Sequence, residues 1–179
     1  MIIGLTGYAQ SGKDSVAKVL VEQYGFTRLA FADKIRDMLY EINPLVKDGF
    51  HLQNVVDGYG WDKAKLLFPE VRGLLQRLGV SARTQVDENI WVVAVMGQMI
   101  DETDYVITDV RFKNEAKIIE QSQGKLWRVN RSGVKAVNSH ISESELDEYK
   151  VDKVLSNDGT LEELESLVHT RMDSLVHAN

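Results

Sequence analysis

The chain has 179 residues, no cysteine, a formal net charge of −6 and a pI near 5.2. This length fits one domain with a substantial core, and the lack of cysteine excludes disulfides and thiolate metal sites. The acidic balance argues against a nucleic-acid surface, but not against small anionic substrates, because a local group of arginines can outweigh the global charge.

No segment predicts a targeting or membrane function. The longest apolar stretch, IWVVAVMGQMI, is interrupted by Gln98 and is too short to span a bilayer. The beginning, MIIGLTG, is not typical of a signal peptide. We therefore expect a cytoplasmic protein without a membrane partner, and the sequence leaves open whether it forms a homodimer.

Predicted strands and helices alternate along the chain. Strands are expected at 1–6, 27–31, 104–110, 125–130 and 151–157, and helices at 13–24, 33–42, 62–79, 87–102, 113–121 and from Thr160 onward. Pro69 predicts a break in the third helix, and 43–60 reads as irregular. Apolar residues expected on buried helix faces include Val16, Val19, Leu20, Met38, Leu39, Ile42, Leu67, Val71, Trp91, Leu161 and Leu164.

This alternation predicts an α/β fold, with a five-stranded parallel sheet between two layers of helices in one domain, 1–179. Ligands of such sheets bind beyond the carboxyl ends of the strands. The polar residues of chemical interest follow strand ends, which places the expected site at that edge of the sheet.

The segment GYAQSGKDS (7–15) has the spacing of a phosphate-binding loop, G-x-x-x-x-G-K, between a strand and a helix. Its glycines allow the backbone to approach phosphate oxygens, and Lys13 would reach the outer phosphates. Asp14 stands where Ser or Thr is usual, and Ser15 follows. Asp14 is either a Mg²⁺ ligand, directly or through water, or a favourable acid in the first helical turn.

The segment TDVR ends the predicted strand 104–110. Asp109 suits a magnesium-side acid, although it could also cap the next helix, and Arg111 suits a bidentate phosphate clamp. The predicted metal ligands are therefore Asp14, Ser15 and Asp109.

Residues 33–90 form the expected acceptor region, and 131–149 the expected lid. Asp33 could orient an acceptor oxygen or cap a helix, and Arg36 could hold the acceptor phosphate. Arg72, Gln76 and Arg83, near Trp91, could read a base and a phosphate or form a solvated helix face. The segment 131–149 lacks apolar periodicity and begins with Arg131; His140 and Glu143 within it could face the acceptor.

A GTPase is excluded by two missing motifs: DVRF stands in place of D-x-x-G, and the late strand ends in LSNDG rather than N-K-x-D. The segments GYAQSGKDSVAKVL, GFTRLAFADKIRDMLYEINP, RGLLQRLG, YVITDVRFKNEA, LWRVNRSG, HISE and LSNDGTLEEL together resemble the phage-type deoxynucleoside monophosphate kinases nearly end to end. In that family, G-K-D-[ST] is the usual loop, which accounts for Asp14 and Ser15. Phosphomevalonate kinases share this loop as more distant relatives.

The resemblance implies a P-loop fold like that of nucleoside monophosphate kinases, and transfer of the ATP γ-phosphoryl group to a dNMP with Mg²⁺. It implies catalytic roles for Lys13, Asp33, Arg111 and Arg131. Nucleotide contacts are expected from Gly7, Ala9, Gln10, Ser11, Gly12, Lys13, Asp14, Ser15, Arg131 and Asn157. Substrate contacts are expected from Asp33, Lys34, Arg36, Arg72, Gln76, Arg83, Trp91, Arg111, His140 and Glu143.

Two positions depart from the family pattern. Gln10 stands where a basic residue is frequent, and Lys34 where proline is frequent. Gln10 keeps a catalytically silent nucleotide-binding module open as an alternative. A kinase for another phosphorylated metabolite, such as phosphomevalonate or dephospho-CoA, is the alternative within enzymes.

Overall fold

The computed structural model describes the backbone of residues 1–176 and their side chains, except those of Asp48 and Val176. These residues form two compact units. The first combines Met1–Ala30 with the chain from Met96 onward, and the second is Phe31–Val95. Each unit has its own helices and its own buried apolar residues.

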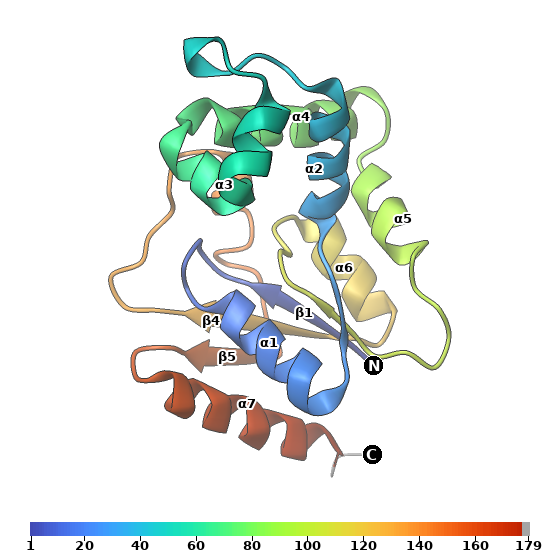
Figure 1. The fold of residues 1–179 in the computed structure, drawn as a ribbon. Coiled ribbons are helices and arrows are strands. Elements are labelled where there is room, and N and C mark those ends of the chain that lie inside the picture. Colours follow the sequence, from blue (N-terminus) through green and yellow to red (C-terminus); the bar gives the residue numbers. More distant parts are fainter. Residues whose placement is uncertain (177–179) are drawn as a thin grey trace. The chain divides into compact units, whose positions relative to one another are not determined.

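A five-stranded parallel sheet forms the centre of the first unit (Figure 1). Its strands are β1 (Ile2–Thr6), β2 (Thr27–Leu29), β3 (Tyr105–Ile107), β4 (Lys125–Asn130) and β5 (Lys153–Ser156), in the order β2-β3-β1-β4-β5. Every neighbouring pair is parallel. The chain leaves β1 toward one side of the sheet and later leaves β3 toward the other. The carboxyl ends of β1 and β3 therefore flank the point where such sheets bind ligands.

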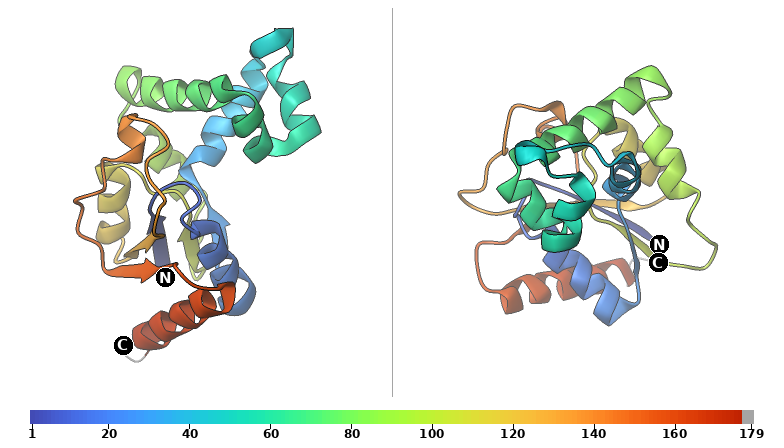
Figure 2. Two further views of the ribbon diagram at one scale, coloured as in Figure 1. Left: turned by 90° about the vertical axis from the view of Figure 1, so that its left-hand side faces the viewer. Right: turned by 45° about the horizontal axis from the view of Figure 1, so that its top comes forward.

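Helices cover both faces of this sheet (Figure 2). Helix α6 (Lys113–Gln121) lies on one face, and α1 (Lys13–Tyr24) and α7 (Leu161–Val176) lie on the other. A Cβ atom on Gly4 of β1 would come within 2.5 Å of Ile119 Cδ1, so α6 packs closely against the central strand. The four consecutive residues Ile3 to Thr6 of β1 are all buried, as expected for a strand covered on both faces. The predicted fold class is confirmed.

The second unit is helical. It contains α2 (Phe31–Ile42), the short 3-10 helix η1 (Lys47–Gly49), α3 (Leu52–Leu67), α4 (Pro69–Gln85) and most of α5 (Ile90–Met96). Buried side chains of α2, α3 and α4 form its core, including Leu39, Leu52, Val55, Ala64 and Val71. Trp91 of α5 donates a 2.9 Å hydrogen bond to the Gly79 carbonyl of α4, which fixes these two helices to each other.

Several predicted boundaries were wrong. The segment predicted as irregular contains the first turns of α3, which begins at Leu52 and is kinked at Gly60, where φ is 73°. The predicted helix 87–102 is only Ile90–Met96. The strand predicted at 27–31 ends at Leu29, because Phe31 already begins α2. The break at Pro69 is confirmed, since this proline opens α4.

Four apolar side chains expected to be buried are exposed: Met38, Ile42, Leu67 and Leu161. Ile42 and Leu67 are the last residues of α2 and α3, and Leu161 is the first of α7. A helical end has no further turn beside it, so apolar periodicity overestimates burial there. Met38 lies beside the buried Leu39, at the edge of the covered stripe of α2.

Within residues 1–176, no helix combines the length and the apolar character that crossing a bilayer requires.

Candidate functional site

The loop between β1 and α1 has the backbone that its glycines predict. Gly7 has φ 131° and Gly12 φ 108°, values that side chains rarely allow. A Cβ atom on Gly7 would lie 2.3 Å from the Val129 carbonyl oxygen of β4. The loop is therefore packed tightly against the neighbouring strand end, which holds it in one shape.

Lys13 is the first residue of α1, and its ammonium group folds back over the loop. Nζ donates to the carbonyl oxygens of Gly7 at 2.9 Å and of Tyr8 at 2.7 Å. Burial, and then the positive charge of Arg111, lower the pKa of Lys13 to about 8, although Asp14, Asp109 and Glu143 oppose this shift. The first amides of α1 have no earlier carbonyl within the helix to bond. The loop therefore presents N–H donors and a cation at a helix N-terminus, the arrangement that binds anions.

Two cavities adjoin this loop. One, of about 350 Å³, gathers many of the predicted nucleotide contacts: it is lined by Gln10, Gly12, Asp14, Ser15, Arg131, Asn157, Gly159 and Leu161. The other is larger, about 590 Å³, and its lining includes Tyr8, Ser11, Arg111, Arg128, Arg131, Glu143 and Asp147. Arg131 lines both, so both cavities border this arginine as well as the loop.

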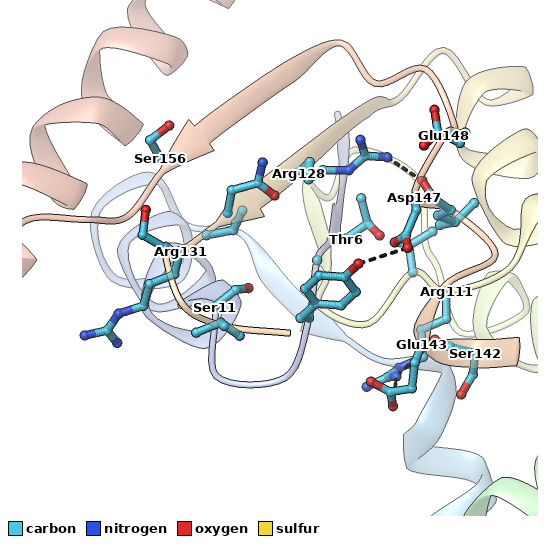
Figure 3. Close-up of a pocket in the computed structure, with 18 of the residues that line it drawn as sticks. Thr6, Ser11, Arg111, Arg128, Arg131, Ser142, Glu143, Asp147, Glu148 and Ser156 are labelled. Carbon is cyan, nitrogen blue, oxygen red and sulfur yellow. Dashed lines mark hydrogen bonds and ion pairs between the residues drawn. The ribbon is translucent and has the colours of Figure 1, made fainter. Parts of the chain in front are cut away.

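Arg111 is held by the segment that follows β4. Its Nη1 donates to Glu143 Oε1 at 2.9 Å and to the Ser142 carbonyl at 3.2 Å (Figure 3). The Glu143 side chain is 2% exposed, against 31% for Arg111. Glu143 Oε2 is buried and makes no hydrogen bond in the described part of the chain. Arg111 thus neutralises a buried carboxylate while part of its guanidinium stays accessible.

The predicted lid, 131–149, is anchored in its C-terminal half. Tyr8 of the loop donates from its hydroxyl to Asp147 Oδ2 at 2.9 Å, and Arg128 of β4 donates to the carbonyls of Leu146 and Tyr149. Leu146 is buried. These contacts come from the phosphate loop and from β4, so residues 141–149 are tied to the walls of the larger cavity (Figure 3).

His140 stabilises the start of the short 3-10 helix η2 (Ile141–Glu143). Its Nδ1 lies 2.8 Å from Ser142 Oγ and accepts from the Ser142 amide at 3.2 Å. These contacts cap the turn that carries Glu143. A substrate contact for His140 stays a prediction, and the observed role is local.

The predicted metal ligands surround Lys13. Asp14 and Asp109 both act on its pKa, Asp14 is exposed in the first turn of α1, and Ser15 is half-buried. Within residues 1–176, no three His, Asp or Glu side chains converge into a metal site made of protein ligands alone. Mg²⁺ bound with nucleotide phosphates takes only one or two carboxylates and completes its shell with water and phosphate oxygens. The donor set of Asp14, Ser15 and Asp109 fits that kind of site.

The predicted acceptor residues lie in the second unit. Asp33 and Arg36 form a 2.8 Å ion pair one turn apart on α2, and Lys34 pairs with Asp37 at 3.2 Å. A hydrogen bond from Lys65 is the main cause that lowers the pKa of Asp62, and Arg36 and Arg72 contribute. Arg36 and Arg72 therefore lie near one acidic group.

The remaining three residues of this set differ in their surroundings. Gln76 and Arg83 follow Arg72 on α4. Trp91 is 3% exposed and hydrogen-bonded to Gly79, so the structure uses it in the core of the second unit.

Several residues of the larger cavity were not predicted from the sequence, chiefly Tyr8, Arg128 and Asp147. Glu115 was not predicted either. Its buried Oε2 accepts hydrogen bonds from the amides of Arg111 at 2.8 Å and Phe112 at 3.0 Å, and these bonds fix the turn that presents Arg111. Arg128 carried a signal, because a charge inside the apolar strand LWRVN needs a polar partner. Tyr8 and Asp147 carried none, since their contact joins distant segments.

Comparison with known proteins agrees with this geometry. A family model described as deoxynucleotide monophosphate kinase matches residues 68–168. A protein of Acanthamoeba polyphaga mimivirus, named as a deoxynucleotide monophosphate kinase, is 29% identical over an alignment of 198 positions, which covers 100% of both chains. The deoxynucleotide monophosphate kinase of Escherichia phage RB69 is 33% identical over 104 residues, which are 55% of this chain and 43% of that protein.

Among solved structures, shikimate kinase from Aquifex aeolicus matches with a TM-score of 0.50 over 98% of both chains at 12% identity. This likeness supports the fold, a parallel sheet covered by helices on both faces. The family match spans more than half of the sequence and includes β3, β4, β5 and the segment that holds Arg111. The chain therefore belongs to the deoxynucleotide monophosphate kinase family.

Proposed function

We propose that the protein transfers the γ-phosphoryl group of ATP to the 5′-phosphate of a deoxynucleoside monophosphate, giving a dNDP and ADP, with Mg²⁺ as cofactor. The observation that carries this proposal is the charge cluster at the carboxyl ends of β1 and β3, where Lys13 interacts with Arg111, Asp14 and Asp109. Phosphoryl transfer depends mainly on positioning and on neutralising charge, and this cluster supplies both cations and metal-side acids.

ATP phosphates would bind across the loop, against its amides and the N-terminus of α1. Lys13 would exchange the carbonyls of Gly7 and Tyr8 for phosphate oxygens, so its present hydrogen bonds hold the ammonium group ready at the site. The rest of the nucleotide would extend into the cavity of about 350 Å³ lined by Gln10, Gly12 and Asn157, with Ala9 and Ser11 in the loop behind it.

Asp14, Ser15 and Asp109 would hold Mg²⁺ beside the outer phosphates, directly or through water. The ion held by these residues would supply charge neutralisation to the outer phosphates. The two carboxylates lie close enough to Lys13 to affect its pKa, which supports a site where acids and a cation would act on one bound phosphate group.

The acceptor is a phosphate monoester that is already ionised near neutral pH, so transfer requires no strong general base. Arg111 and Arg131 would stabilise the charge of the transferring group. The acceptor region of the second unit would be formed by Asp33, Lys34, Arg36, Arg72, Gln76 and Arg83, and Trp91 would support it from the core through its hydrogen bond to Gly79. His140 and Glu143 would contribute from the predicted lid.

The test is ADP release with ATP and Mg²⁺ against a panel of the four common dNMPs, the matching ribonucleotides, phosphomevalonate and dephospho-CoA. We expect turnover with at least one dNMP, lost in Lys13→Ala. Turnover only with another metabolite would reassign the kinase. ATP binding without any acceptor-dependent ADP release would contradict the proposal in favour of a silent nucleotide-binding module.

A further inference from the structure

We infer that Asn157 is a positioning residue that sets the phosphate loop in the conformation that binds the donor phosphates. This inference rests on the proposed function and deepens it: besides lining the proposed nucleotide cavity, the Asn157 side chain acts through the peptide group between Ser11 and Gly12.

Asn157 lies directly after β5 and connects β4, β5 and the loop. Its backbone amide donates to the Asn130 carbonyl at the end of β4 at 2.7 Å. Its side-chain Nδ2 donates to the Ser11 carbonyl at 2.9 Å. Asn157 is 8% exposed and Ser11 1%, so water competes little for this hydrogen bond. The donor group is therefore fixed by the sheet and directed at one carbonyl of the loop.

Gly12 shows how closely the Asn157 amide is fitted to the loop. A Cβ atom at position 12 would lie 2.3 Å from Asn157 Nδ2 and 3.2 Å from its Cγ. The amide thus occupies the space that any other residue at position 12 would need. Because Gly12 also has φ 108°, the loop depends here on both a glycine and the asparagine packed against it.

The consequence for phosphate binding follows from peptide geometry. In a planar trans peptide, the C=O and N–H bonds point in opposite directions. Since Asn157 holds the Ser11 carbonyl on one side of the loop, the Gly12 N–H of the same peptide points to the other side. Asn157 itself lines the cavity of about 350 Å³, so the Gly12 N–H points away from the Asn157 side of the loop. Asn157 therefore fixes one of the backbone donors that the loop would present to an anion.

Removing the Asn157 donor frees the Ser11–Gly12 peptide to rotate. Asn157→Ala would lose one backbone hydrogen bond to a charged phosphate oxygen, which corresponds to roughly 10- to 100-fold weaker ATP binding. Affinity for the acceptor should change less than threefold, because the hydrogen bonds of Asn157 in the described part of the chain go to Ser11 and Asn130, which are not proposed to bind the acceptor. A general loss of structure would lower both affinities together.

Asn157→Asp separates the hydrogen bond from packing, because aspartate has the same shape as asparagine. The ionised carboxylate would place an oxygen against the Ser11 carbonyl oxygen and weaken ATP binding at least as much as Asn157→Ala. The protonated acid carries an O–H that can donate to that carbonyl, so ATP affinity should recover at least threefold from pH 8 to pH 5.5. Charged groups around position 157 also titrate or act on this pH range: Asp14 and Arg131 in this cavity, and Asp158, Glu162 and Glu163 in the next one. They are common to all variants, so each affinity is expressed as a ratio to wild type.

The experiment is an equilibrium titration of ATP, with Mg²⁺ and without acceptor, for wild type, Asn157→Ala, Asn157→Asp and the control Asn54→Asp. Asn54 is exposed on α3, so the control makes the same chemical change at a solvent-facing position. Thermal melts verify folding, and a separate titration of the accepted dNMP measures acceptor affinity. If Asn157→Ala does not fold, Asn157→Asp at pH 8 replaces it as the variant without a donor.

The outcomes distinguish a failure of the inference about Asn157 from a failure of the proposed function. Weaker ATP binding in Asn157→Ala, with recovery of Asn157→Asp in acid and no change in Asn54→Asp, supports the inference. Wild-type affinity in Asn157→Ala, or an Asn157→Asp ratio that does not respond to pH, overturns it and leaves the proposed function standing. If wild type itself binds no ATP, the proposed function fails as well.

Discussion

The ion pair between Arg111 and Glu143 predicts a specific pattern of stability. Replacing Arg111 by methionine keeps the length of the side chain but leaves the Glu143 carboxylate, 2% exposed, without its cation. Breaking a fully buried pair costs about 3–5 kcal/mol. Because Arg111 is 31% exposed, water would reach part of the site, and we expect the lower figure of about 2–3 kcal/mol. For a protein of this size, that lowers Tm by about 4–12 °C.

The second half of this prediction is recovery. Glu143→Gln in the Arg111→Met background removes the uncompensated charge, so the double variant should regain at least half of the lost stability. The measurement is a double-mutant cycle by urea denaturation at pH 7. Lys18→Met serves as a control, because Lys18 and Glu22 form an exposed pair at 3.8 Å and its loss should cost less than about 0.5 kcal/mol. Single-variant effects that add to within about 0.5 kcal/mol would refute the claim that Arg111 neutralises Glu143.

Four further predictions concern the loop and the predicted lid. Because the pKa of Lys13 is lowered to about 8, ATP should bind with proton uptake near pH 8–8.5. Calorimetry in buffers of different ionisation enthalpy measures this uptake, which should be absent in Lys13→Met. Equal binding heats in all buffers would contradict the prediction. The lowered pKa also means that the charge of Lys13 destabilises the folded state. This destabilisation is complete below pH 8 and decreases as the pH rises toward 10.5. Lys13→Met should therefore raise Tm at pH 7 more than at pH 10. Arg131→Ala should reduce kcat on the order of 10³-fold without changing Tm, and turnover within a few fold of wild type would exclude a transition-state role. Tyr8→Phe removes the hydrogen bond to Asp147 and should speed proteolysis within 140–149 several fold. The free energy of unfolding should change by less than about 1 kcal/mol. An unchanged cleavage rate would show that this hydrogen bond does not hold the segment.

Local patterns predicted the sheet and the loop well, because their determinants are close in sequence. Gly7, Gly12 and Lys13 lie within one turn and one helix start, where backbone conformation dictates residue type. Helix α3 was harder to predict. Gly58 and Gly60 lower helix propensity, but the burial of Leu52, Val55 and Ala64 against α4 outweighs that cost.

Contacts between distant segments explain what the sequence did not reveal at the site. Tyr8 and Asp147 are 139 positions apart, and Ser11 and Asn157 are 146 apart, so no local pattern joins them. Asn157 was predicted as a nucleotide contact from the family resemblance. Its hydrogen bond to the Ser11 carbonyl could not be predicted, because it depends on the sheet bringing the ends of β1, β4 and β5 side by side.

The most direct test of the central claim is to follow the phosphoryl group itself. The protein is incubated with [γ-³²P]ATP, Mg²⁺ and each dNMP, and the nucleotides are then separated. The account predicts label in a dNDP, formed in equal amount to ADP and absent with Lys13→Ala. Label only in inorganic phosphate, or none transferred to any dNMP, would contradict the assignment of this site to dNMP phosphorylation.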